Sequence, residues 1–161
     1  MGDLDGDGDL DIVLAKGRHD PYVDKVLLND GRGRFVTSNL GSTADLAVGD
    51  EAAASLTVYM NDGTGRLIPG FHIADKQRTP YAMTAADLNG DRHPDIVLGY
   101  TEGPHSVFFN DGSGKRFVEV TFGDKAGAAY GFAIGDINGD GRPDIALARS
   151  AAPNVLYLNG K

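Results

Sequence analysis

The chain has 161 residues, of which 41% are hydrophobic and 24% charged, a composition typical of a globular domain or a few small repeated units. Its formal net charge of -8 argues against nucleic acid as a partner, and the absence of cysteine excludes disulfides and thiolate metal sites. No apolar run approaches the roughly 20 residues of a membrane span, and Met1 leads directly into acidic residues, so we expect neither a membrane span nor a signal peptide.

The chain opens with a run of like charge. Every second residue is an aspartate, at Asp3, Asp5, Asp7, Asp9 and Asp11. The run leads directly into the apolar residues 12–14. Carboxylates this close repel one another and disfavour an ordered segment unless a positive charge lies among them. The opening therefore predicts a bound cation.

Two markers then repeat along the chain. The acidic motif recurs at Asp87 and Asp136, which are 49 residues apart. A turn signal, Asn-Asp-Gly or Asn-Gly, begins at Asn29, Asn61, Asn110 and Asn159. Such turns supply residues that tolerate positive φ and are typical of hairpins. The sequence therefore predicts repeated units of strands joined by tight turns.

Strands are expected around both markers. In the complete unit we expect them at 81–86, 95–99, 106–109 and 116–120. Four strands in about 49 residues match one blade of a β-propeller. The sequence therefore predicts an all-β fold of propeller-type blades with about four antiparallel strands each. We expect the propeller to be partial or to be completed by an oligomer.

Residues 1–161 form one repeat domain. Its blade-like units are expected at about 1–40, 41–74, 75–125 and 126–161. The third unit is complete, while the first lacks its opening strand and the last lacks its closing strand. The second unit is shortened, because only 11 residues separate Asp50 from Asn61 where intact units have 23. We expect this unit to lack an acidic loop and a metal.

Each acidic loop has oxygen-bearing side chains at motif positions 1, 3, 5 and 9, with glycine at position 4. Position 7 would contribute its backbone carbonyl. Calcium takes six to eight oxygen ligands at about 2.3–2.6 Å, which alternate residues of a tight loop can supply. We therefore predict Ca²⁺ at about three sites, one in each loop. The candidate ligand residues are Asp3, Asp5, Asp7, Asp9 and Asp11, then Asp87, Asn89, Asp91, His93 and Asp95, and finally Asp136, Asn138, Asp140, Arg142 and Asp144.

Other calcium loops fit this pattern less well. An EF-hand needs Glu at position 12 and a following helix, whereas position 12 here is Leu14, Leu98 or Leu147. Dockerin-like loops fail for the same reason. The apolar residues after each loop predict instead that it is a hairpin joining two strands. Solvated Asp/Gly turns are the alternative, which three copies on one spacing disfavour.

Residues 132–145, FAIGDINGDGRPDI, resemble the FG-GAP or VCBS repeat of integrin α-subunit propellers and many bacterial surface proteins. The turns at Asn29 and Asn110 resemble the same repeats, so the resemblance covers almost the whole chain except the shortened second unit. It implies a calcium-bearing β-propeller that is extracellular, periplasmic or at the cell surface. It also implies that the side chains at positions 1, 3, 5 and 9 of each loop are the calcium ligands.

The chain departs from the family pattern in two ways. Arg92 stands where the other loops have Gly8 and Gly141. If this position needs positive φ, Arg92 costs on the order of 1 kcal/mol and weakens the second site. The chain also has fewer blades than the family's about seven. Unpaired edge strands favour pairing, so we expect a fragment of a larger propeller or a homo-oligomer formed through unpaired blade edges.

The sequence offers no catalytic constellation. The histidines lack metal-ligand spacing, and neither a nucleophile elbow nor a phosphate loop occurs. We therefore expect a non-catalytic calcium-binding module for protein or cell-surface adhesion, with a protein or glycan ligand that the sequence does not identify. A glycan-binding lectin and the scaffold part of a polysaccharide-active enzyme are the alternatives. A glycan array tests the first, and calcium-dependent turnover of a polysaccharide tests the second.

Overall fold

The computed structural model describes residues 12–14, 25–29, 31–32, 34–38, 46–50, 55–61, 67–74 and 78–160. All the regular secondary structure within these ranges is β-strand, so the predicted all-β class is confirmed. None of the described residues belongs to a helix of the length and apolarity that a membrane crossing requires.

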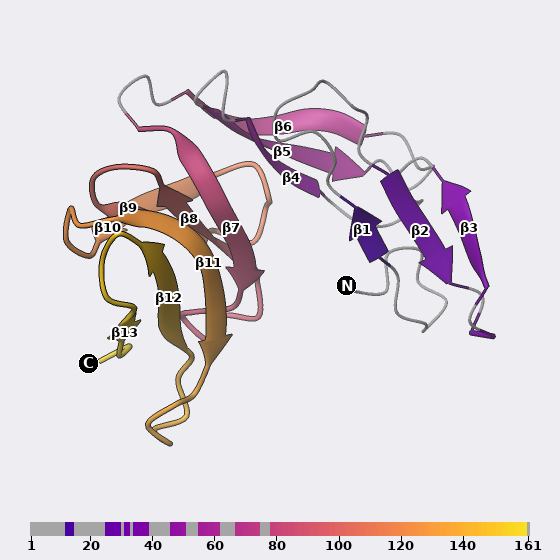
Figure 1. The fold of residues 1–161 in the computed structure, drawn as a ribbon. Helices are drawn as coiled ribbons and strands as arrows, with labels where there is room; N and C mark the ends of the chain where they lie inside the picture. Colours follow the sequence, from indigo (N-terminus) through magenta and orange to yellow (C-terminus); the bar gives the residue numbers. More distant parts are fainter. Residues whose placement is uncertain are drawn as a thin grey trace. The chain divides into compact units, whose positions relative to one another are not determined.

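The described strands follow one another as simple meanders (Figure 1). They are β1 (Ile12–Leu14), β2 (Lys25–Asn29), β3 (Phe35–Ser38), β4 (Leu46–Asp50), β5 (Ser55–Asn61), β6 (Leu67–Ala74), β7 (Pro80–Ala86), β8 (Asp95–Tyr100), β9 (His105–Asn110), β10 (Phe117–Phe122), β11 (Ala128–Gly135), β12 (Asp144–Ser150) and β13 (Val155–Tyr157). The sheets have the orders β1-β2-β3, β4-β5-β6, β10-β9-β8-β7 and β11-β12-β13.

The chain divides into two compact units. One comprises Met1–Leu46 and Tyr59–Pro69, and the other Ala47–Val58 and Gly70–Lys161. The first unit includes the β1–β3 sheet, in which neighbouring strands are antiparallel. The second unit includes the β7–β10 and β11–β13 sheets and, with them, two of the predicted acidic loops.

The β7–β10 sheet is the complete repeat unit. Its strands are antiparallel throughout, and Ile96 in β8 lies opposite Ala85 in β7 and Phe108 in β9. Every residue of β8 is buried, whereas most of the outer strand β10 is exposed. The continuous apolar run of β8 suits a strand covered on both faces. All four predicted strands of this unit are confirmed, with ends displaced by one or two residues.

The β11–β13 sheet repeats this arrangement with three described strands. Ile134 in β11 pairs with Ile145 in β12, and Leu147 in β12 pairs with Val155 in β13. A register shift between Ala129 and Gly131 interrupts the β11–β12 ladder. β11 also contacts β7 and β8, so the two sheets of this compact unit pack against each other.

The core between these two sheets is apolar. Leu88, Val97, Val107 and Ile145 are its buried members, and partly buried aromatic residues, among them Phe132, pack around them. Gly99 permits the close approach of Phe132, because a Cβ at Gly99 would lie 2.8 Å from the phenyl ring. Burial of these side chains is the main favourable term that holds the sheets together.

Candidate functional site

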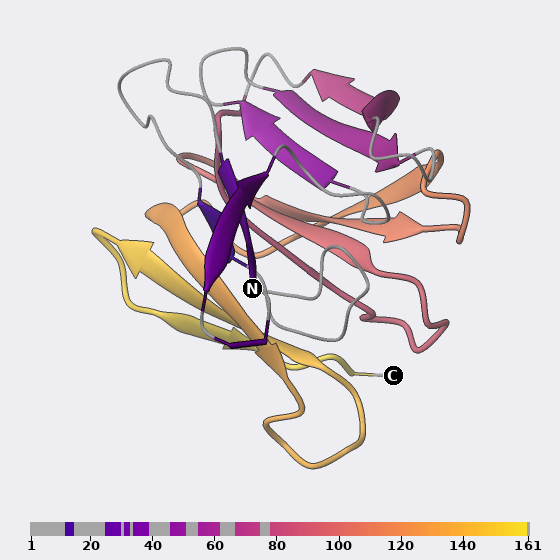
Figure 2. The ribbon, with the colours of Figure 1, turned by 90° about the vertical axis from the view of Figure 1, so that its right-hand side faces the viewer.

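Two acidic loops, residues 87–94 and 136–143, connect the first two strands of their sheets. The first lies between β7 and β8 and the second between β11 and β12, and both strand pairs are antiparallel. Figure 2 shows the loop between β11 and β12 extending beyond the ends of its strands. In chain order, the loops at Asp3, Asp87 and Asp136 are the first, second and third acidic loops. The prediction of a hairpin between strands, with no helix after the loop, is confirmed for both. The candidate ligands of the opening loop lie outside the described residues; these are Asp3, Asp5, Asp7, Asp9 and Asp11.

The first aspartate of each loop folds the backbone around its own carboxylate. Asp87 Oδ1 accepts hydrogen bonds from the backbone N–H groups of Gly90 at 2.7 Å and Asp91 at 3.2 Å. Its Oδ2 accepts from the N–H of Arg92 at 2.8 Å. Asp136 accepts from the equivalent N–H groups, those of Gly139, Asp140 and Gly141. The two loops therefore share one backbone conformation.

This conformation requires positive φ at two positions of each loop. Position 4 is glycine in both, with φ of 82° at Gly90 and 78° at Gly139. At position 6, Gly141 has φ of 84° and Arg92 has φ of 70°. The prediction that Arg92 occupies a glycine position is confirmed. A left-handed conformation costs a non-glycine residue about 1–2 kcal/mol, so the second loop is strained where the third is not.

The side chains at positions 3 and 5 bond to each other and to the loop backbone. Asn89 Oδ1 accepts from the N–H of Asp91 at 2.9 Å, while Asn89 Nδ2 donates to Asp91 Oδ2 at 2.8 Å. Asp91 Oδ1 in turn accepts from the N–H of His93 at 2.8 Å. Asn138, Asp140 and Arg142 form the same three bonds in the third loop. The side chains predicted as ligands thus bond to the loop backbone and shape the turn.

The aspartate at position 9 is fully buried in both loops, with 0% exposure at Asp95 and Asp144. Asp95 Oδ2 accepts from the N–H of Leu88 in its own loop, and Oδ1 accepts from the N–H of Asn110, both at 2.9 Å. Asp144 bonds in the same way to the N–H groups of Ile137 and Asn159, again at 2.9 Å. This carboxylate therefore ties the acidic loop to the Asn-Gly turn two strands later.

Sequence reasoning listed position 9 only as a ligand and missed this second role. The signal was present in the distance of 23 residues between the start of the acidic motif and the turn asparagine, which the units starting at Asp87 and Asp136 share. Asn110 Nδ2 and Asn159 Nδ2 strengthen the tie by donating to the carbonyls of Pro94 and Pro143, each at 3.2 Å. Asn159 Nδ2 also donates to the carbonyl of Leu88 at 2.8 Å, which joins the two sheets.

Charge and burial act differently on these carboxylates. Desolvation raises the pKa of Asp87, but backbone N–H bonds led by that of Arg92 outweigh it, so this pKa is lowered. Burial raises the pKa of Asp95 against the bonds from Asn110 and Leu88, and the charges of Asp91 and Asp87 raise it further. In the second loop, repulsion between like charges therefore acts on the carboxylate of Asp95.

The equivalent buried carboxylate in the third loop behaves differently. The N–H bonds from Asn159 and Ile137 lower the pKa of Asp144, and desolvation only partly opposes them. Hydrogen bonds to the ionised form therefore outweigh desolvation at Asp144, whereas desolvation outweighs them at Asp95.

The residues of the two described loops suit calcium in their chemistry. They offer carboxylate, amide and carbonyl oxygens, which are the ligands that Ca²⁺ prefers, and an oxygen that accepts one N–H bond keeps a further lone pair. The repulsion that raises the pKa of Asp95 would be relieved by a divalent cation. Among the described residues, however, no three Asp, Glu or His side chains converge as a ready metal site. The loops therefore fit the ion in donor type and charge, and their side chains would have to turn towards it.

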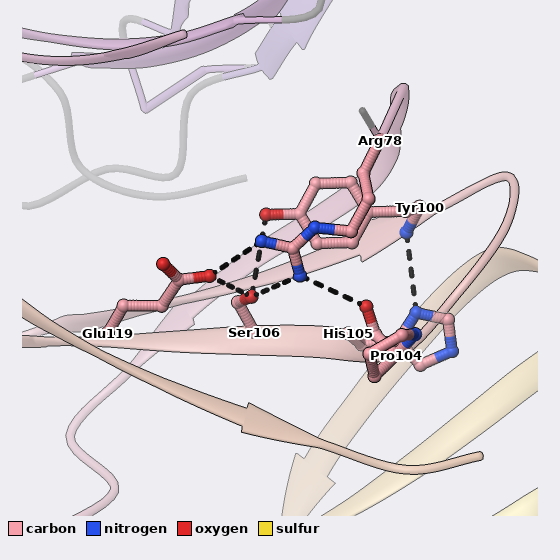
Figure 3. Close-up of polar contacts among 6 residues, drawn as sticks. All are labelled: Arg78, Tyr100, Pro104, His105, Ser106 and Glu119. Carbon is pink, nitrogen blue, oxygen red and sulfur yellow. Dashed lines mark hydrogen bonds and ion pairs between the residues drawn. The ribbon is translucent and has the colours of Figure 1, made fainter. Parts of the chain in front are cut away.

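A second polar cluster lies between β7 and β10 (Figure 3). Arg78 donates to Ser106 Oγ at 3.1 Å and to Glu119 Oε1 at 2.8 Å, and its guanidinium lies 4.2 Å from the centre of the Tyr100 ring. Ser106 Oγ donates to Glu119 Oε1 at 2.6 Å. The neighbouring His105 is buried, and its Nδ1 accepts from the N–H of Tyr100 at 3.3 Å.

This cluster does not have the geometry of a nucleophile with its base. The Ser106 hydroxyl bonds directly to a carboxylate, while the described bond of His105 is made to the backbone. Burial and the charge of Arg149 lower the pKa of His105, which keeps the imidazole neutral. Arg78 instead links the chain before β7 to β9 and β10, because it also donates to the carbonyl of Pro104 at 3.2 Å. The cluster therefore links the segment before β7 to β9 and β10.

Comparison with known proteins identifies the repeat. The model of an FG-GAP-like repeat matches the chain over two overlapping stretches, residues 42–98 and 87–147. The match includes both described acidic loops and also the shortened second unit, which the sequence resemblance left out. No curated protein sequence matches the chain.

Replacing Arg92 by glycine should stabilise the fold. We expect Arg92→Gly to raise the free energy of unfolding by about 1 kcal/mol, because glycine adopts positive φ without steric cost. The reverse exchange at the equivalent position, Gly141→Arg, should lower it by a similar amount. Urea unfolding followed by circular dichroism in the presence of chelator measures both. Equal midpoints for the wild type and both variants would show that this position is not strained.

The two buried aspartates should give stability profiles that depend on pH in opposite directions. The pKa of Asp144 lies below its ordinary 3.8, so its carboxylate stabilises the fold above that value, and this contribution is lost as the pH falls through the folded pKa. The pKa of Asp95 is raised above 3.8, so ionisation of Asp95 lowers stability as the pH rises through its folded pKa.

The measurement compares urea unfolding of the wild type with Asp144→Asn and Asp95→Asn, in chelator, from neutral pH to about pH 3. The advantage of the wild type over Asp144→Asn should shrink at low pH, whereas its advantage over Asp95→Asn should grow. Two differences that both stay constant with pH would contradict the assigned shifts.

Proposed function

Because the chain belongs to the FG-GAP-like repeat family, we propose that it is a non-catalytic, calcium-binding β-propeller module for protein or cell-surface adhesion. Repeats of this family commonly bind calcium. The observation that carries the proposal is the shared architecture of the two described loops, in which the backbone curls around the carboxylate of the first aspartate. In the loop of residues 87–94, the charges of Asp91 and Asp87 also act on Asp95, and a divalent cation would relieve this repulsion.

Calcium would have a structural role in this proposal. The side chains at positions 1, 3, 5 and 9 and the carbonyl at position 7 would hold it in each loop. The bound ion would supply positive charge, and oxygen atoms of these residues would coordinate it. Because Asp95 and Asp144 also bond to the turns at Asn110 and Asn159, ordering a loop would stabilise its whole sheet.

Packing within the second compact unit supports the propeller arrangement. The first strands of its two sheets, β7 and β11, contact each other, and Tyr81 and Tyr130 form an edge-to-face pair with ring centres 5.1 Å apart. These tyrosines are 49 residues apart and so occupy the same position of successive repeats. Repeats that stack through equivalent positions in this way are the building principle of propeller blades.

The proposed role as an adhesion module without catalysis rests on family membership and on the polar clusters. The described Ser, His and carboxylate side chains near one another are engaged in bonds that hold strands together, as at Ser106 and His105. A place outside the cytoplasm, either extracellular, periplasmic or at the cell surface, follows from the same family and is part of the proposal. The ligand would be a protein or a glycan of another surface.

The calcium role is tested by thermal unfolding of chelator-stripped protein with and without added Ca²⁺. We expect calcium to raise the melting temperature, since an ion that binds only the folded state stabilises it by about 2.7 kcal/mol at a hundredfold excess over Kd. The double variant Asp91→Asn, Asp140→Asn should lose most of this rise. Glu102→Gln removes a charge from an exposed residue outside the loops and should keep the full rise.

Equal melting temperatures for the wild type in calcium and in chelator would overturn the calcium role. A rise that the double variant retains in full would move the ions away from the two described loops. Neither outcome would contradict the described fold, because the fold is defined by the pairing of its strands.

A further inference from the structure

One face of the β11–β13 sheet is apolar and exposed. Ile137 is 54% exposed, and Leu156 and Leu158 are 44% and 56% exposed. Ala133, Ala146 and Leu156 pair in turn across β11, β12 and β13, so they share one face of the sheet. They line a groove of about 570 Å³ together with Ala148. Apolar groups gathered on one face indicate a surface for interaction.

The equivalent face of the β7–β10 sheet is covered. At an offset of 49 residues, the equivalents of Ile137, Leu156 and Leu158 are Leu88, Val107 and Phe109. Leu88 and Val107 are each only 6% exposed, and Phe109 is partly buried, because the β11–β13 sheet covers them. The same face of the repeat is therefore buried on one sheet and exposed on the next.

The groove also indicates the size of the side chains that it receives. Val97 is 0% exposed and fills the covered face of the β7–β10 sheet, whereas its equivalent in the β11–β13 sheet is the smaller Ala146. The smaller side chain at this position leaves room for the groove. A covering sheet has to bring bulky apolar residues, as the β11–β13 sheet brings Phe132 to Gly99.

The covering side of a repeat is marked by an Ile-x-Leu sequence directly after the acidic loop. In β12 these residues are Ile145 and Leu147, which are 8% and 1% exposed, and Ile145 belongs to the core between the sheets. In the first unit, Ile12 and Leu14 of β1 occupy the same positions of the repeat. The shortened repeat, residues 41–74, has neither the acidic motif nor an Ile-x-Leu sequence after it. By position in the repeat, the sequence of the first unit thus carries the same pair of apolar residues.

We propose that the exposed face of the β11–β13 sheet binds the β1–β3 sheet of a second copy of this chain. The contact would continue, between two chains, the interface that the β7–β10 and β11–β13 sheets form within one. Because the two surfaces differ, the association is head-to-tail, so it forms a closed ring or a longer assembly. This inference goes beyond the proposed calcium role and does not depend on it.

The test is sedimentation velocity of the full chain over a wide range of protein concentration, in calcium and in chelator. We expect the mass of the wild type to rise with concentration and Leu156→Glu to remain a monomer. Leu156 is already half exposed, so a charge there is compatible with the folded chain, which circular dichroism verifies. The matched control is Val118→Glu, on the outer strand β10, where Val118 is 61% exposed. This control should associate like the wild type.

A mixing experiment tests the head-to-tail order. Leu156→Glu keeps the first sheet intact, and Leu14→Glu keeps the exposed face of the last sheet intact. Each variant alone should be a monomer, and an equimolar mixture should form a dimer with one copy of each. A wild-type monomer at every concentration would overturn the proposal.

Two other results would also overturn it. Association that survives Leu156→Glu would place the contact elsewhere on the molecule. Association abolished by Val118→Glu but not by Leu156→Glu would show that chains pair through the edge strand β10 instead. The melting-temperature test of calcium is independent of all these outcomes, so a failure of one proposal is distinguishable from a failure of the other.

Discussion

A buried carboxylate at the start of the second strand holds each described repeat together. Asp95 and Asp144 accept one N–H bond from the acidic loop before them and one from the asparagine of a turn two strands later. Leaving a buried charged acceptor without such partners would cost several kcal/mol, so loop and turn have to take up these positions together. The acidic loop, its strands and the following hairpin are therefore one structural element with a charge at its centre.

This element also links a loop to the neighbouring sheet. Asn159 follows β13 in the last sheet, yet its side chain donates to the carbonyl of Leu88 in the acidic loop of the sheet before it. Leu88 at the same time contributes its side chain to the apolar core between the two sheets. Any ion that orders an acidic loop would act on the packing of two sheets through this contact. Metal affinity and the stability of the repeat stack are thus expected to be coupled.

Local features of this fold could be predicted from the sequence, and contacts between distant segments could not. Alternating and continuous apolar runs located β7 to β10 within one or two residues, and the comparison of loops revealed the glycine position held by Arg92. Neither the second role of Asp95 nor the bond from Asn159 to Leu88 follows from a local pattern, since the latter joins residues 71 positions apart. Arg78 gave no signal either, because it belongs to no repeated motif.

The claim that the acidic loops hold calcium is tested most directly by isothermal titration calorimetry of chelator-stripped protein. We predict one ion for each of the three acidic loops of the sequence, with the loop that contains Arg92 binding more weakly than the others. Arg92→Gly should strengthen that weakest site and leave the number of ions unchanged. An absence of binding heat up to about millimolar calcium, well above the Kd range of most calcium loops, would contradict the claim and leave the carboxylates as components of ordinary turns.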